Sequence, residues 1–367
     1  MWPRFVRRWL VAVILTSSLY ILASSALHIE SIFQALFDKA TRQWITQSLA
    51  GSAFWILAFS LMYPIVVFFR GSDNNLYGLE HAILNIDIPP RSMWMNMGYW
   101  EPGLTFPDAC KRLLEVVLQY AGLLDQDGRP SAKASSARLI DVGFGCGDQT
   151  MYLTQNAPGR RALVNHYVGI TLNRVQMEYA RRRLNGASSD IRLFCADAAR
   201  PDSWDPELRE AARALAHRDS DTDSRPWLLA LDTLYHFRPS REPLFTYARK
   251  QLSASIMAFD LILSDSVTWL QRLVLRIACL LGSTPWSNFM RADAYRDMLV
   301  RAGYDREKIE IHDISERVFP GVAEYIRRRG EELRPFGLGV GRLGVAGRLF
   351  GWWGRSGVVL GVIVVAR

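Results

Sequence analysis

The chain has 367 residues, 49% of them hydrophobic, and a formal net charge of +8. This length allows one large domain or two small ones, and the apolar content is high for a purely soluble enzyme. The positive charge suits an anionic membrane surface. A nucleic-acid partner is not expected, because no basic run is interleaved with stacking aromatic residues. The four cysteines have no metal-type spacing, so we expect free thiols and no metal site.

Two apolar stretches near the N-terminus carry no charged residue, Trp9 to Leu27 and Gln43 to Phe69. At a rise of about 1.5 Å per residue, each can cross a hydrocarbon layer of about 30 Å. They predict a membrane anchor over residues 1–75, with transmembrane helices at about residues 9–27 and 47–69. A cleaved signal peptide is an alternative interpretation of the first stretch, and it would place the rest of the chain in the secretory lumen.

The distribution of Lys and Arg predicts the orientation of this hairpin. Arg4, Arg7 and Arg8 precede the first stretch, whereas the loop between the two stretches carries only Lys39 and Arg42. More basic residues follow the second stretch. Because basic flanks stay on the cytosolic side, we expect both ends of the hairpin in the cytosol. The rest of the chain would then face the cytosol at an internal membrane such as the endoplasmic reticulum.

Strand and helix patterns alternate from about residue 108 to the C-terminus. Strands are predicted at residues 138–142, 167–171, 191–195, 227–231, 257–264, 309–314 and 358–366, and helices at 109–121, 149–156, 175–184 and from Pro239 to about 252. Strands separated by helices of this length favour a parallel sheet with helices on both faces. The sequence therefore predicts an α/β fold over residues 137–367, preceded by a cap and lid segment over residues 76–136.

The segment LIDVGFGCGDQT is the most informative in the chain. Asp141 lies at the end of a predicted strand, and Gly143, Gly145 and Gly147 form a turn before a predicted helix. Such a turn lets the backbone approach a bound cofactor at the N-terminus of a helix. A dinucleotide fingerprint requires glycine at the next position, where this chain has Asp148, so a dinucleotide is not the expected cofactor.

Two further segments follow the next two strands. YVGITLNRVQ ends its strand with Thr171 and Leu172 and carries Gln176 in the following helix, with no acidic residue at the strand end. FCADAARPDSW places Asp197 and Ala198 directly after the third strand. Gln176 has the alternative of being only a surface helix residue, and Asp197 the alternative of being only a turn residue.

The remaining two segments lie before the sheet and at the end of the fourth strand. NMGYWEPG, residues 96–103, contains Tyr99, which is either part of a ligand site or part of an aromatic cluster at a domain edge. LDTLYHFRPS contains Asp232, Tyr235 and His236. Active sites of open α/β sheets lie at the carboxyl ends of the strands, so all three lie near the expected site, and Tyr235 and His236 are the candidate catalytic residues.

Together these segments resemble the class I S-adenosylmethionine (SAM) methyltransferases. The Thr-Leu-Gln pattern resembles the branch that contains cyclopropane-fatty-acid synthases, sterol methyltransferases and tocopherol-type methyltransferases. The resemblance implies a Rossmann-like seven-stranded sheet, whose last strand runs antiparallel between the fifth and sixth, and SAM as the cofactor. The cofactor-binding residues that it implies are Tyr99, Asp141, Gly143, Gly145, Gly147, Thr171, Leu172, Gln176, Asp197 and Ala198.

The resemblance also implies individual roles. The glycines would approach the methionine part of SAM, with Asp141 near its charged end. Thr171, Leu172 and Gln176 would replace the acid that usually holds the ribose, and Tyr99 would close over the cofactor. A neighbouring aromatic face attracts a cation.

His236 is the leading candidate for a catalytic base, because histidine exchanges protons near neutral pH. In the cyclopropane-synthase-like branch a histidine often follows an acidic residue at the matching place. Tyr235 replaces that acid here, which puts cyclopropanation in doubt. The alternative is that both side chains only form the wall of a pocket.

The sequence therefore predicts a membrane-anchored, SAM-dependent methyltransferase that acts on a hydrophobic small molecule, either a lipid or a secondary metabolite. The alternatives are a membrane-tethered SAM-binding protein without turnover and a cyclopropane-synthase-like lipid-modifying enzyme. Residues 266–290 are predicted to build an acceptor pocket or to form a packed core helix. The glycine-rich residues 338–353 are predicted to be an interfacial element or a mobile cap, since their composition disfavours a helix by itself.

Overall fold

The computed structural model describes residues 38–39, 92–131, 134, 137–156, 161–184, 190–217, 226–282, 284–334 and 338–367. All of these except residues 38 and 39 belong to one compact unit, Phe69–Arg367. The two predicted transmembrane stretches, and the signal-peptide alternative, lie outside the described residues. Within the described part of the chain, no helix combines the length and the apolar content that a bilayer span requires.

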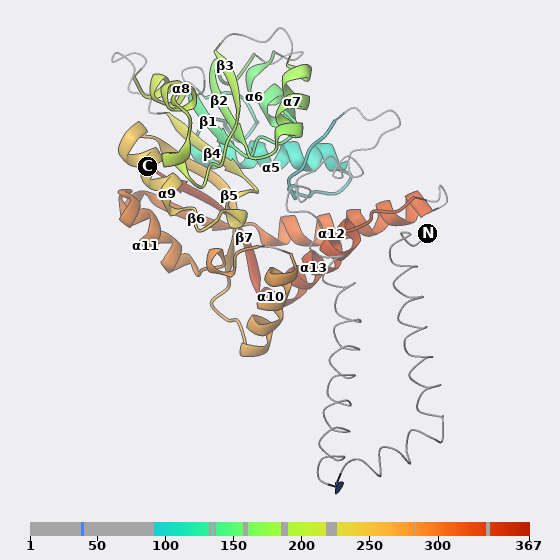
Figure 1. The fold of residues 1–367 in the computed structure, drawn as a ribbon. Helices are drawn as coiled ribbons and strands as arrows, with labels where there is room; N and C mark the ends of the chain where they lie inside the picture. The colour runs from blue at the N-terminus through green and yellow to red at the C-terminus, as the bar shows by residue number, and fades with distance from the viewer. Residues whose placement is uncertain are drawn as a thin grey trace. The chain divides into compact units, whose positions relative to one another are not determined.

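Seven strands form one mixed sheet in the order β3-β2-β1-β4-β5-β7-β6 (Figure 1). The strands are β1 (Arg138–Val142), β2 (His166–Thr171), β3 (Ile191–Cys195), β4 (Trp227–Leu231), β5 (Ser255–Leu263), β6 (Ile309–Asp313) and β7 (Val359–Ala366). β1 to β5 pair in parallel, and β7 runs antiparallel between β5 and β6. The predicted Rossmann-like sheet is therefore confirmed, including the place and direction of its last strand.

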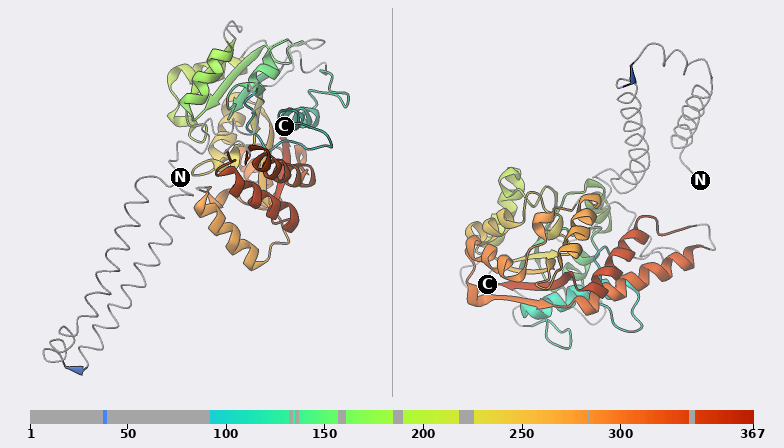
Figure 2. Two further views of the ribbon diagram at one scale, coloured as in Figure 1. Left: turned by 90° about the vertical axis from the view of Figure 1, so that its right-hand side faces the viewer. Right: turned by 90° about the horizontal axis from the view of Figure 1, so that it is seen from below.

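Helices cover both faces of the sheet (Figure 2). They are α5 (Phe106–Ala121), α6 (Asp148–Thr154), α7 (Arg174–Arg183), α8 (Pro206–His217), α9 (Glu242–Leu252), α10 (Trp269–Leu281), α11 (Ala292–Ala302), α12 (Ser315–Leu333) and α13 (Leu343–Ser356), with short 3₁₀ turns η3 (Pro201–Ser203), η4 (Leu234–His236), η5 (Trp286–Asn288) and η6 (Arg306–Lys308). α5, α6, α7, α12 and α13 contribute to one hydrophobic core, and α8, α9 and α11 to the other. Every residue of β1 and β5 is buried, as expected for strands covered on both faces.

Two elements differ from the expectations. α9 begins at Glu242 with Pro243 in its first turn, and Pro239 lies before it in a cis peptide bond with Arg238. The predicted helix start at Pro239 is therefore wrong.

The glycine-rich region forms α13, because α12 supplies the packing that its composition lacks. A Cβ on Gly347 would lie 2.9 Å from Ile326, and one on Gly354 would lie 3.3 Å from Phe319. These glycines let the two helices approach closely, and tertiary packing then offsets their low helix propensity.

Candidate functional site

The glycine turn between β1 and α6 has the geometry that its sequence predicts. Gly143, Gly145 and Gly147 all have positive φ, a conformation that side chains with a Cβ rarely adopt. A Cβ on Gly143 would lie 2.8 Å from Thr233, and one on Gly147 would lie 2.9 Å from Ala180. The turn therefore fits closely between the end of β4 and α7, and only glycine satisfies both the backbone and the space.

Asp141 lies in β1, two residues before Gly143, and is fully buried. Its carboxylate accepts hydrogen bonds from Nε2 of Gln149 at 2.8 and 2.7 Å and from the hydroxyl of Tyr167 at 2.6 Å. Burial raises the pKa of Asp141 to about 7, although both hydrogen bonds act to lower it. The side chain therefore ties the end of β1 to α6 and to β2. Its predicted contact with the charged end of a cofactor stays a prediction.

A cavity of about 330 Å³ lies at the carboxyl ends of β1 to β4, a size within the usual range for small-molecule sites. The predicted residues that line it are Gly143, Gly145, Thr171, Leu172, Gln176, Asp197, Ala198 and His236. The other four predicted residues are described by the structure but do not line the cavity, namely Tyr99, Asp141, Gly147 and Tyr235. The order of the sequence segments thus places most of the predicted site around one cavity.

The second and third segments contribute as predicted to this lining. Gln176 is buried, with Oε1 accepting a hydrogen bond of 3.2 Å from the hydroxyl of Thr171, so the surface-residue alternative is wrong. Leu172 is 71% exposed, which leaves its side chain open to a ligand. Asp197 both lines the cavity and accepts the Ala199 N–H at 2.9 Å, so its turn role and its lining role coexist.

Residues 93–97 form a strap across the glycine turn, fixed at both ends by carboxylates. Asp148 accepts the backbone N–H of Met93 at 3.1 and 3.2 Å and pairs with Arg183 at 2.9 Å. Asp232, at the end of β4, accepts the N–H of Met97 at 2.7 Å. Between these points, the Met95 sulfur lies 3.7 Å from Nε2 of Gln176. The strap therefore closes one side of the cavity.

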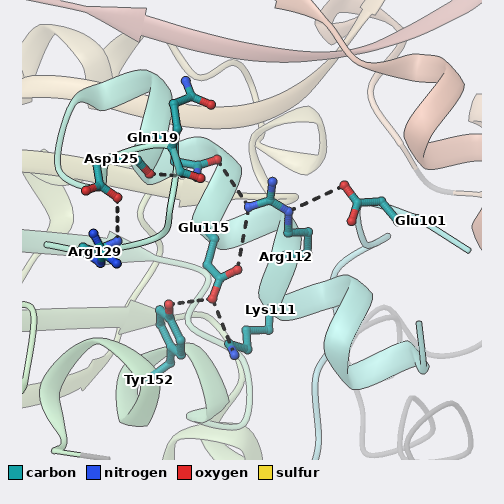
Figure 3. Close-up of polar contacts among 9 residues, drawn as sticks. Glu101, Lys111, Arg112, Glu115, Gln119, Asp125, Arg129 and Tyr152 are labelled. Atoms are coloured by element: carbon teal, nitrogen blue, oxygen red, sulfur yellow. Dashed lines mark hydrogen bonds and ion pairs between the residues drawn. The ribbon is translucent and has the colours of Figure 1, made fainter. Parts of the chain in front are cut away.

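Tyr99 and Trp100, which follow the strap, do not line the cavity. Tyr99 is held by α5, where Arg112 lies over its ring at 5.8 Å. Figure 3 shows Arg112 between Glu101 and Glu115, and Glu115 also accepts the hydroxyl of Tyr152 from α6 at 2.8 Å. The lid role of Tyr99 stays a prediction. From this part of the chain, residues 93–95 and Asn96 line the cavity, and of these only Asn96 belongs to the predicted segment 96–103.

Trp100 has a structural role. Its ring packs against Tyr325 of α12 at a centroid distance of 5.3 Å and against Phe106 at 6.2 Å. Its indole N–H donates to the Met97 carbonyl at 2.8 Å. Trp100 is therefore part of an aromatic cluster with Phe106 and Tyr325.

The loop after β4 holds the candidate catalytic groups. Burial lowers the pKa of His236 to about 3, and the positive charge of Arg238 contributes a smaller part of this shift. Burial raises the pKa of Asp232 to about 7, opposed by hydrogen bonds from Tyr235 and the Met97 N–H. Both groups line the cavity, whereas Tyr235 is buried beside the Asp232 carboxylate. Because a base works best with a pKa near the working pH, Asp232 is better suited than His236 to accept a proton.

A buried network supports this loop from behind. Nδ2 of Asn288 donates to the carbonyls of Tyr235 and Phe237 at 3.0 and 2.7 Å. The Asn288 carbonyl in turn accepts a hydrogen bond from Arg241, which pairs with Asp260 inside the protein. The position of His236 therefore depends on residues from α9, β5 and η5.

Asp148, Asp232 and Asn288 are the functional candidates that the sequence analysis missed or did not select. Asp148 was noted only because it excludes a dinucleotide fingerprint, and Asp232 only because it is near a strand end. A signal for Asp232 was present, since it directly follows a buried strand. The sequence around Asn288 contained no such signal. Among the described residues, no group of three or more His, Cys, Asp or Glu side chains is arranged to hold a metal ion.

The raised pKa of Asp141 predicts an unusual dependence of stability on pH. The folded state binds a proton on this group up to about pH 7, whereas the unfolded chain releases it near 3.8, the ordinary pKa of an aspartate. Stability from this group is therefore present at low pH and lost as the pH rises. Relative to Asp141→Asn, which cannot ionise, wild type should lose about 2–3 kcal/mol of unfolding free energy between about pH 5 and about pH 8.

Chemical denaturation of both proteins across this range measures the difference. Glu310 and Glu324 have lowered pKa values and change stability in the opposite direction. Since both remain in the variant, the comparison removes their contribution. Parallel curves for the two proteins would contradict the prediction.

Comparisons with known proteins give no sequence match but many structural ones. No protein-family model matches the sequence, and no curated protein matches it. The cyclopropane synthase MmaA2 from Mycobacterium tuberculosis aligns with a TM-score of 0.54 at 13% identity, covering 83% of this chain and 98% of its own. The fold is that of the class I methyltransferases. The predicted resemblance is thus confirmed at the level of the fold, which is what similarity at this identity shows.

Two further structures extend the comparison. The mycolic acid cyclopropane synthase CmaA1, solved with SAH and CTAB, has a TM-score of 0.54 at 13% identity, covering 79% of this chain and 95% of its own. The [4+2]-cyclase SpnF has a TM-score of 0.52 at 18% identity, covering 80% of this chain and 94% of its own. Proteins with this fold therefore include enzymes with different named activities.

Proposed function

We propose that this chain is a SAM-dependent methyltransferase whose acceptor is a hydrophobic small molecule, a lipid or a secondary metabolite. The observation that carries the proposal is the convergence of five sequence segments on one cavity. These segments are the strap, the glycine turn and the ends of β2, β3 and β4. Four of them, the glycine turn and the ends of β2, β3 and β4, correspond to segments of the resemblance identified from the sequence, whereas the strap overlaps the predicted segment 96–103 only at residues 96 and 97. The fold is shared with methyltransferases and cyclopropane synthases.

The residues present fit the proposed cofactor. Gly143 and Gly145 leave backbone without side chains at the cavity wall, which suits close approach of a methionine moiety. Thr171 and Gln176 offer a hydroxyl and an amide near the end of β2 in place of the usual acid, and we assign them to the ribose. Asp197 and Ala198 are assigned to the adenine. When bound, SAM supplies a methyl group carried on a positively charged sulfur.

The residues of the chain would then position the acceptor and receive its proton. Asp232 lines the cavity, and a carboxylate oxygen of its ionised form accepts the proton that the acceptor loses. His236 stays neutral, because its pKa is lowered to about 3, and it forms the wall beside Asp232. The strap excludes water on one side, which strengthens electrostatic interactions in the cavity.

The nature of the lining supports a hydrophobic acceptor. The apolar side chains of the cavity wall come from three places. The strap contributes Met93, Trp94 and Met95, the glycine turn contributes Phe144, and the loop after β4 contributes Phe237. Thioether and aromatic side chains adapt to apolar ligands. The few polar groups would fix orientation, as in most small-molecule sites.

A second candidate is a SAM-binding protein that does not transfer a methyl group. The structural similarity to the [4+2]-cyclase SpnF favours including it, because that protein has the same fold and a different named activity. A cyclopropane-synthase-like activity is the other alternative, and Tyr235 in place of an acid argues against it. A methylated product that carries the label of methyl-labelled SAM separates the proposed function from the non-transferring alternative.

We also propose that the chain is anchored in an internal membrane, with the catalytic unit facing the cytosol. The support is the pair of uncharged apolar stretches in residues 9–27 and 43–69 and the excess of basic residues outside them. Glycosylation reporters fused after residues 30 and 75 measure this topology. Modification at the second position would reverse it.

Calorimetry with S-adenosylhomocysteine (SAH) tests the cofactor assignment. Gln176→Ala should weaken SAH binding by roughly tenfold, because one buried hydrogen bond is worth about 1 kcal/mol and its partner Thr171 is left unsatisfied. Gln126→Ala is the matched control, since Gln126 is exposed and its side chain has no described role in the site. Wild type that folds but releases no heat with SAH or SAM would refute the proposed function.

A further inference from the structure

The helix α10 presents an apolar face that no predicted role explains. The sequence predicted that residues 266–290 build an acceptor pocket or a packed core helix. No described residue of this segment lines the cavity. Only Leu275 and Cys279 of α10 are buried, and they anchor the helix to the core beside α12 and α13. Figures 1 and 2 show α10 projecting from the body of the unit.

The exposed side chains of α10 form a continuous stripe. Trp269 is 77% exposed and Leu280 69%, at the two ends of the helix. Leu270, Leu273, Val274 and Ile277 lie between them, each at least 42% exposed. At 100° per residue these six positions share one face of the helix, opposite Leu275 and Cys279. They make up more than half of the exposed large hydrophobic side chains that the structure describes, so this is a concentrated surface rather than scattered exposure.

The charges of α10 are all of one sign. Arg272 and Arg276 lie along one border of the stripe, and the helix contains no Asp or Glu. Arg276 is exposed and stacks over the ring of Trp286 at 5.0 Å. An amphipathic helix with Trp and Leu on one face and arginine at its border has the composition of helices that lie in a lipid interface, where arginine reaches the headgroups.

A capping box stabilises the N-terminus of α10. The Thr268 hydroxyl accepts the Gln271 N–H at 3.3 Å, and Oε1 of Gln271 accepts the Thr268 N–H at 3.0 Å. A cap of this kind contributes about 1 kcal/mol. The folded unit therefore presents a capped helix with its apolar stripe exposed.

We propose that α10 docks in the surface of a lipid bilayer that contains anionic lipids. The basic border and the absence of acids match an anionic surface, and the net charge of the chain is also positive. The two uncharged apolar stretches of residues 9–27 and 43–69 offer a second contact with the same bilayer. A second copy of the chain fits less well, because a two-fold contact through this stripe would bring the same arginines together.

The chain continues from α10 into η5, whose Asn288 donates hydrogen bonds to the carbonyls of Tyr235 and Phe237 in the loop that contains His236. The docking surface does not depend on methyl transfer, since it follows from α10 alone.

Fluorescent labelling of the full-length chain in vesicles tests this inference. Cys195 is the exposed one of the four cysteines, so the label is placed in a Cys195→Ser background. Ile277→Cys carries a nitrobenzoxadiazole label on the stripe, and Val300→Cys carries it on α11 as a matched exposed aliphatic position. In vesicles containing phosphatidylglycerol, emission at position 277 should rise several-fold and shift to the blue, with no comparable change at position 300.

Four comparisons make the outcome decisive. Arg272→Gln with Arg276→Gln should lower the signal in anionic vesicles toward that in pure phosphatidylcholine, and added salt should do the same for wild type. Equal signals at positions 277 and 300 would overturn the inference. A rise at position 277 with protein concentration in detergent, without vesicles, would also overturn it, because a second copy would then cover the stripe.

SAH calorimetry on the same labelled proteins separates this test from that of the proposed function. A labelled protein that binds SAH but shows no lipid signal counts against the docking surface alone. If the label at position 277 disturbs folding, Leu280→Cys, which is more exposed on the same stripe, replaces it.

Discussion

Asp232→Asn is expected to reduce turnover by about 10²–10⁴-fold, the usual contribution of a positioned general base, with little change in SAH affinity. The carboxylate lines the cavity and accepts the Met97 N–H at 2.7 Å. Asparagine keeps an oxygen for that N–H, so the strap stays closed, but an amide cannot take a proton. Single-turnover rates with methyl-labelled SAM, together with calorimetry, measure the two effects separately.

The pH profile identifies which group is the base. Burial raises the pKa of Asp232 to about 7 in the folded chain, opposed by the hydrogen bonds from Tyr235 and the Met97 N–H. Its ionised form is the active one, so the rate should rise with pH and level off above the pKa. A bound sulfonium favours the carboxylate and moves the midpoint below 7. If His236 were the base, the rise would instead lie near pH 3 or lower.

His236→Gln and Asp202→Asn are the comparisons for this prediction. His236→Gln should lower the rate less than Asp232→Asn and leave the pH profile in place. Asp202 is exposed in η3, so its substitution should change neither rate nor profile. An Asp232→Asn protein that retains the rate of wild type, or a His236→Gln protein that loses the profile, would contradict the assignment.

The sheet and the glycine turn could be predicted because their causes are local. Strands such as β1 and β5 are continuous apolar runs, which is typical of strands buried on both faces. The turn requires positive φ at Gly143, Gly145 and Gly147, and glycine at these positions indicates it directly. The side chains that follow each parallel strand then meet at one edge, so Thr171, Asp197 and His236 could be placed around one site before the fold was known.

The parts that could not be predicted depend on contacts between distant residues. Asp148 and Met93 are 55 positions apart, and Asp232 and Met97 are 135 apart. No local pattern pairs them, so the sequence indicates Tyr99 in residues 96–103 and not residues 93–95, which lie over the turn and line the cavity. The relative roles of Asp232 and His236 also depend on burial, which moves one pKa up and the other down.

A buried ion pair behind the catalytic loop is the other feature that composition does not reveal. Arg241 and Asp260 are both fully buried and paired, and the hydroxyl of Tyr295 also donates to Asp260 at 2.9 Å. Arg241 donates to the carbonyl of Asn288, whose amide holds the loop at Tyr235. The pair therefore links the interior of the fold to the candidate site.

Arg241→Met should lower the free energy of unfolding by about 3–5 kcal/mol, because it leaves the Asp260 charge buried without its partner. Arg301→Met is the matched control. Arg301 makes a similar two-bond contact with Glu242 at 3.0 and 3.1 Å, but on the surface, where water and salt screen the pair and its loss should change stability far less. Urea denaturation of the two variants measures the difference.

Removing both charges separates the cost of an unpaired ion from the worth of the pair. Arg241→Met combined with Asp260→Leu should recover part of the lost stability, since no charge is then left in the interior. It should not restore the position of the catalytic loop, because the Asn288 carbonyl still lacks its donor, so turnover should stay low while stability improves. Equal destabilisation by Arg241→Met and Arg301→Met would show that the buried pair does not hold this part of the fold.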